Sequence, residues 1–151
     1  LSSWLIGRGW SVWKARKGAM LMFAVLVLPV IAVRFGPGIW TAVALIGLAG
    51  AAHQAWSANI FTTASDMFPK RTVSSVVGIG SMAGSVGGII FPEIVGRILD
   101  NYKKVGDVQS GYGIIFLICG FAYLTAWVVM HLLTPKMQPV NLEARESEPV
   151  A

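Results

Sequence analysis

Few side chains in this sequence could do chemistry, and the densest group lies at positions 53–59, where the residues read HQAWSAN. An imidazole, two amides and a hydroxyl beside an indole ring are groups that commonly bind a polar solute such as a sugar. On a helix, Gln54 and Ser57 share one face, whereas His53 and Asn59 lie on another. The stretch therefore predicts either one wall of a solute cavity or a set of interhelical hydrogen bonds, which polar residues often form in membrane bundles.

Glu93 and Arg97 form the second candidate group. They are four residues apart, so on a helix their side chains lie on the same face and can pair. The pair predicts either an anchor at a membrane boundary or an outer gate. His53 is the other residue that we consider as a gate or as a proton-responsive group.

The sequence does not indicate metal, redox or enzyme chemistry. The two histidines, His53 and His131, are far apart with no cysteine or histidine near either, and Cys119 is the single cysteine. No metal site, cofactor or internal disulfide is therefore expected. The apolar segments contain no nucleophile–base pair and no paired carboxylates, which argues against an enzyme.

The candidate side chains lie on or next to long apolar segments, which must position them. Of the 151 residues, 55% are hydrophobic and 13% are charged, which is about half the charge of a typical soluble domain. Four stretches of 16, 31, 21 and 28 residues lack Asp, Glu, Lys and Arg altogether. About 20 apolar residues cross a bilayer as a helix, and Lys17 and Arg34 can snorkel to the headgroups at the ends of the shortest stretch. The sequence predicts an all-α membrane protein with four transmembrane helices, at about Gly18–Phe35, Ile39–Thr63, Thr72–Leu99 and Gly111–Thr134.

The basic residues indicate which way the helices face. With four spans, eight basic residues fall on one side of the membrane and four on the other. The positive-inside rule places the richer side in the cytoplasm, including the segment before the first span and residues 136–151. That last segment is polar and acidic and is predicted to be a disordered tail. Because the net charge of +5 comes from helix ends rather than from a continuous stripe, no nucleic-acid partner is expected.

The third predicted span is rich in glycine. Gly80, Gly84 and Gly88 are spaced as two consecutive GxxxG motifs, which predicts close packing against another helix or a smooth interface for sliding. Ser81 lies within the same repeat. Pro92 is expected to kink this span near its outer end.

Several passages resemble a known family. HQAWSANIFTTASDMFPKR, followed by SVVGIGSMAGSVGGI, resembles helices ten and eleven of the major facilitator superfamily. Within that superfamily, the resemblance is to the anion:cation symporter branch and to its bacterial hexuronate transporters. Residues 1–17 resemble the end of helix eight and the cytoplasmic loop after it, and the passage from Ala122 to Lys136 resembles the final helix. The resemblance implies that residues 18–135 are helices nine to twelve of a twelve-helix transporter.

The resemblance also implies a function, which is proton-coupled symport of a sugar acid such as a hexuronate by alternating access. The expected location is a bacterial inner membrane, with the C-terminus in the cytoplasm. The expected partners are the lipid bilayer, a small organic anion, protons and a missing N-terminal half that holds the proton-binding and carboxylate-binding residues. Residues 1–151 alone would then transport nothing. By position, the substrate-binding residues would be Gln54, Ser57, Asn59, Phe61 and Ser81.

One alternative is a freestanding four-helix membrane scaffold or assembly protein. Such a protein would need its own start, whereas residue 1 is Leu and Leu1–Ile6 has the character of a helix that is already under way. A reading frame that continues upstream through further hydrophobic segments would favour the transporter.

Overall fold

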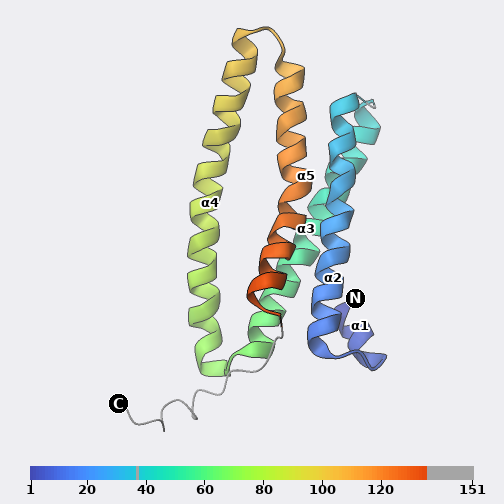
Figure 1. The fold of residues 1–151 in the computed structure, drawn as a ribbon, viewed down its shortest axis with the longest axis vertical. Helices are drawn as coiled ribbons and strands as arrows, with labels where there is room; N and C mark the ends of the chain where they lie inside the picture. The colour runs from blue at the N-terminus through green and yellow to red at the C-terminus, as the bar shows by residue number, and fades with distance from the viewer. Residues whose placement is uncertain (37, 136–151) are drawn as a thin grey trace.

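The structure is a computed structural model that describes residues 1–36 and 38–135. Every regular element in this part of the chain is a helix (Figure 1): α1 (Ser2–Gly7), α2 (Val12–Val27), the 3-10 helix η1 (Leu28–Phe35), α3 (Ile39–Met67), α4 (Lys70–Lys104) and α5 (Val108–Leu133). The predicted tail, residues 136–151, lies outside the described residues.

Four segments of the described chain are long and apolar enough to cross a membrane: α2 continued by η1, then α3, α4 and α5. This confirms the predicted all-α membrane fold with four spans. The helices extend beyond the predicted spans: α2 begins at Val12 rather than Gly18, and α4 reaches Lys104 rather than Leu99. Residues 12–17, expected from the resemblance to belong to a cytoplasmic loop, are therefore helical. Backbone hydrogen bonding can continue past the hydrocarbon core. A charge-free stretch therefore predicts which residues cross the membrane more accurately than it predicts where the helix begins and ends.

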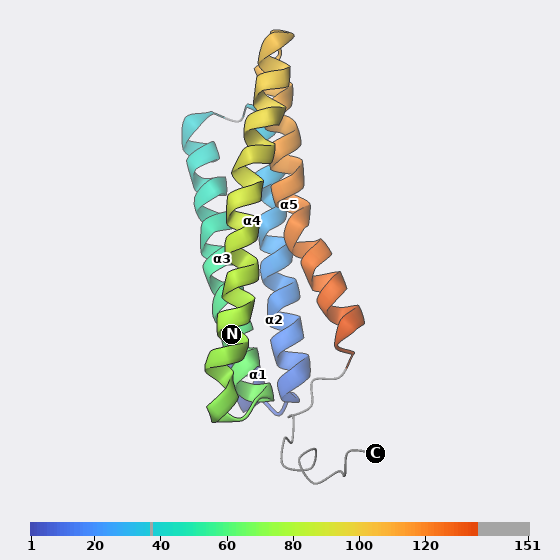
Figure 2. The same ribbon diagram turned by 90° about the vertical axis from the view of Figure 1, so that its left-hand side faces the viewer.

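The helix α2 has more buried residues than any other described helix. It packs against α3 and α5, and η1 continues the same contacts (Figure 2). Its inner face is made of small residues, since Ala15, Ala19 and Ala24 are completely buried. Small side chains let neighbouring helices approach closely. Met20 and Ala24 also form a core cluster with Trp56 of α3, which fixes α3 against α2.

The first span ends in a 3-10 helix because of its proline. Pro29 lies at the beginning of η1, where its missing N–H and its ring are incompatible with continued α-helical hydrogen bonding. Gly36 ends η1 with a left-handed φ of 64°, a conformation that glycine adopts without strain. The chain then reverses direction into α3.

The helix α4 is the most exposed of the four spans. It packs against α5 and α3, and none of its residues is buried. A Cβ atom added at Gly80, Gly84 or Gly88 would meet nothing within 4 Å, so no described helix packs closely on this GxxxG face, and close packing through it stays a prediction. The motif gives a smooth helix face but does not itself specify a partner. The helix continues through Pro92.

Candidate functional site

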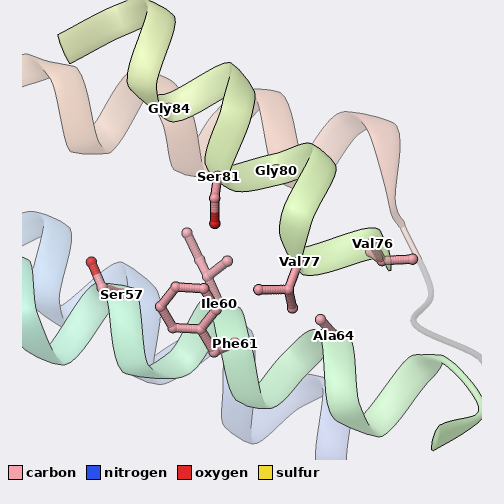
Figure 3. A pocket seen from close by; sticks show the side chains of 9 residues that line it. All are labelled: Ser57, Ile60, Phe61, Ala64, Val76, Val77, Gly80, Ser81 and Gly84. Atoms are coloured by element: carbon pink, nitrogen blue, oxygen red, sulfur yellow. The ribbon is translucent and has the colours of Figure 1, made fainter. Parts of the chain in front are cut away.

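The candidate site is a pocket between α3 and the first half of α4 (Figure 3). Its volume is about 400 Å³, and pockets of about 300–1,000 Å³ are typical of small-molecule sites. The glycines on the α4 wall contribute no side chain, which leaves this space open. Nine residues line the pocket: Ser57, Ile60, Phe61, Ala64, Val76, Val77, Gly80, Ser81 and Gly84. Three of the five predicted substrate-binding residues are among them.

Ser57 and Ser81 supply the only polar side chains among the residues that line this pocket. Figure 3 shows them on opposite walls, Ser57 on α3 and Ser81 on α4, with the ring of Phe61 beside them. Neither hydroxyl is hydrogen-bonded to another group in the described part of the chain. Because a hydroxyl can both donate and accept, the pocket can hold a small molecule with polar groups on two sides and an apolar surface against Phe61.

Gln54 lies outside the set of residues that line the pocket. It is exposed on α3, about one turn before Ser57 and on the same face of the helix. Its amide is therefore near the end of the pocket rather than in its wall. The sequence grouped these two residues correctly on one helix face, but the structure brings only Ser57 opposite α4.

His53 lies on a different face of α3. Its Nδ1 atom is hydrogen-bonded to the hydroxyl of Tyr123 on α5. The Tyr123 ring packs edge-on against Trp56, with the ring centroids 5.3 Å apart. His53 and Tyr123 belong to the wall of a second, mainly apolar pocket of about 540 Å³, to which α3 and α5 contribute. His53 is thus separate from the pocket that contains Ser57 and Ser81.

Asn59 is buried, with 8% of its surface exposed, and takes part in an internal network. Its Oδ1 atom accepts a hydrogen bond from the Ser2 hydroxyl at 2.9 Å, and its Nδ2 atom donates to the Ala55 carbonyl at 3.0 Å. The Ser2 hydroxyl also accepts from Arg16 Nη1 at 2.6 Å, and Arg16 Nε pairs with Asp66 Oδ2 at 2.9 Å. Both ends of the Asn59 amide are engaged within the protein, so its placement does not support the assignment to the substrate pocket.

Glu93 and Arg97 form the predicted ion pair. Glu93 Oε1 and Arg97 Nε are 2.9 Å apart, and both side chains are exposed on α4. Glu93 is twelve residues beyond Ser81, which corresponds to about 18 Å along the helix axis. The pairing is therefore confirmed, and the pair is well separated from the pocket.

A comparison with protein-family models matches residues 2–151 to the model described as Major Facilitator Superfamily. The chain belongs to the major facilitator superfamily. Comparisons with curated proteins and with solved structures gave no match. Members of the superfamily carry solutes across membranes and are not enzymes, so this major facilitator chain belongs to a multi-pass membrane transporter.

Some interhelical contacts of this major facilitator chain had no signal in the sequence. Lys17 is 3% exposed, and its ammonium group donates to the carbonyls of Thr134 and Pro135 at the end of α5. A cation in this position satisfies carbonyls that have no partner within their own helix. The Trp127 indole donates to the Lys17 carbonyl at 3.0 Å. The sequence placed Lys17 only at a membrane edge, because partners more than a hundred positions away leave no local pattern.

Proposed function

We propose that this chain is the C-terminal part of a symporter that couples uptake of a sugar acid, such as a hexuronate, to protons. In this proposal the described spans are helices nine to twelve of a twelve-helix transporter in a bacterial inner membrane, with the C-terminus in the cytoplasm. The observation that supports it best is the pocket in which Ser57 and Ser81 face each other across α3 and α4 beside Phe61.

The chemistry of this pocket suits the ring of a sugar. Hydroxyls on opposite walls can exchange hydrogen bonds with the hydroxyls of a pyranose, and an aromatic ring can pack against its C–H face. Gln54, at the end of the pocket, adds an amide that can donate and accept. No charged side chain is among the residues that line the pocket, so this wall would bind the neutral part of the substrate. The substrate carboxylate would be bound by the N-terminal half.

Proton coupling and gating would use other residues in this proposal. His53, which is hydrogen-bonded to Tyr123, is the proton-responsive candidate because an imidazole ring nitrogen can both accept and donate a proton. The Glu93–Arg97 pair would act as an outer gate, about 18 Å along α4 from Ser81. The two groups are therefore distinct from the sugar-binding wall and can be tested separately.

The proposal is tested by uptake of a panel of labelled sugar acids into cells that express the full-length protein, with and without a protonophore. We expect concentrative uptake of at least one hexuronate or related sugar acid, abolished by the protonophore. Removing one hydroxyl from the wall, in Ser57→Ala or Ser81→Ala, should raise KM by roughly 2- to 12-fold, the effect of one hydrogen bond of about 0.5–1.5 kcal/mol.

Ser85→Ala is the matched control for these variants. Ser85 is one turn beyond Ser81 on the same helix, does not line the pocket, and donates to the Ser81 carbonyl at 3.0 Å. Its loss should leave KM unchanged. Uptake that no sugar acid supports, or identical KM values in all three serine variants, would contradict the proposal.

A further inference from the structure

The turn between α1 and α2 presents aromatic and basic side chains on the surface of the protein. Trp4 and Trp10 are 53% and 51% exposed, an unusual amount for indole rings. The guanidinium carbon of Arg8 lies 3.8 Å from the centroid of the Trp4 ring, and Lys14 Nζ lies 5.7 Å from that of Trp13. We refer to Trp4, Arg8, Trp10 and Lys14 as the turn surface.

The backbone holds the turn surface in a defined shape. The amides of Gly9 and Trp10 donate to the carbonyls of Ile6 and Leu5 at 2.9 and 3.2 Å. Gly9 has a φ of +89°, which favours glycine, and this allows the chain to reverse within a few residues. Arg8 and Trp10 therefore project from a closed turn rather than from a loose segment, so little further ordering is needed for binding.

The charge of the turn surface is strongly positive. The first 17 residues contain four basic residues and no acidic one. Two of the four, Arg16 and Lys17, are buried and have partners within the protein. Arg16 forms an ion pair with the carboxylate of Asp66. The exposed side chains of Arg8 and Lys14 are therefore the ones that can meet an anion from outside.

The position of the turn surface relative to the bilayer identifies the kind of anion. The charge-free part of the first span begins at Gly18, four residues and about 6 Å along α2 after Lys14, so Lys14 lies in the headgroup layer and the turn borders it. Indole rings favour this interfacial layer, and basic side chains beside a span are attracted to anionic lipids. We propose that the turn surface binds the phosphate-bearing headgroup of an anionic phospholipid, with Arg8 and Lys14 as the charged contacts and Trp10 in the interface.

The test uses the intact protein in vesicles of phosphatidylcholine that contain brominated phosphatidylglycerol, whose bromine atoms quench nearby tryptophans. The quenching that disappears in Trp10→Phe reports on the turn surface alone. We expect this component to show a preference for brominated phosphatidylglycerol over brominated phosphatidylcholine. Each basic side chain near the membrane surface should contribute roughly a fivefold change in relative association, so Arg8→Ala combined with Lys14→Ala should remove most of the preference.

The matched control is the double variant Lys103→Ala with Lys104→Ala. It also removes two positive charges, but at the opposite end of the bundle, in the last turn of α4 (Figure 1). The preference seen by Trp10 should survive in this control. Equal quenching by the two brominated lipids, or a preference that is unchanged when Arg8 and Lys14 are replaced, would overturn the proposal and leave the turn surface to a partner protein. Size-exclusion profiles of both variants verify that they fold.

Discussion

The close contact between α5 and the first span leads to a prediction about Gly120. Gly120 is buried, and a Cβ atom added to it would lie 2.5 Å from Cγ1 and 2.7 Å from Cδ1 of Ile31. Carbon atoms in good contact are about 3.5–4.0 Å apart, so the alanine methyl approaches Ile31 Cγ1 too closely by about 1–1.5 Å. Gly120→Ala must therefore move Ile31 off its preferred rotamer or separate the two helices.

The magnitude follows from the two effects of the methyl group. Overpacking of this kind destabilises by about 1–3 kcal/mol. Replacing glycine by alanine within a helix stabilises by up to about 1 kcal/mol, because glycine loses more backbone entropy on folding. The same gain applies at Gly47 of α3, where an added Cβ would meet nothing within 4 Å. Comparing Gly120→Ala with Gly47→Ala cancels the helix-propensity effect, and the free energy of unfolding should differ by about 1–3 kcal/mol.

Thermal unfolding of the intact protein in detergent, followed by fluorescence-detected size exclusion, measures this difference. Gly120→Ala should melt at a lower temperature than the wild type, and Gly47→Ala at the same or a higher temperature. Gly113→Ala is an intermediate case, because its nearest atom, on Arg34, would be 3.7 Å away in ordinary contact. Equal melting temperatures for Gly120→Ala and Gly47→Ala would refute the packing of α5 against the first span.

Three further predictions concern polar groups. Arg16→Ala removes the contacts to Asp66 and Ser2 and should lower the free energy of unfolding by about 1.5–3 kcal/mol in the same thermal assay, and a loss near zero would contradict the network. Tyr123→Phe removes the partner of His53 and should change the pH profile of uptake; an identical profile would remove His53 from proton coupling. The hydrogen bond from Ser110 lowers the pKa of Asp107 below its ordinary value of 3.8, so the carboxylate cap is fully present above pH 3.8 and is lost as the pH falls through the lowered pKa. Asp107→Ala should accordingly speed hydrogen exchange at the start of α5 at neutral pH and have no added effect in acid.

The sequence was sufficient to predict the four spans because the bilayer imposes one simple rule. A segment that crosses it needs about 20 apolar residues, and stretches without charge reveal such segments directly. The pairing of Glu93 with Arg97 was equally accessible, since residues four apart on a helix are neighbours whatever the rest of the fold does. These features depend on local spacing, which a single sequence contains.

Features that depend on contacts between helices were not accessible in the same way. Asn59 looked like a cavity residue because it is polar and lies in a span, but its partner Ser2 is 57 positions away. Lys17 was placed at a membrane edge although it engages the end of α5. Ser57, Phe61 and Ser81 do line one pocket, because Ser57 and Phe61 share one face of α3 and the turn after α3 brings Ser81 of α4 opposite that face; that they bind substrate stays a prediction.

The central claim, that a sugar acid binds between α3 and α4, is tested most directly by substrate protection of a cysteine. Ser81→Cys is introduced into the full-length protein together with Cys119→Ser, which removes the thiol of residues 1–151, and the rate of alkylation at position 81 is measured with and without a hexuronate. The account predicts that the hexuronate slows alkylation at position 81 but not in the matched Ser85→Cys variant, which lies outside the pocket. Alkylation at position 81 at the same rate with and without every sugar acid that the protein transports would contradict it.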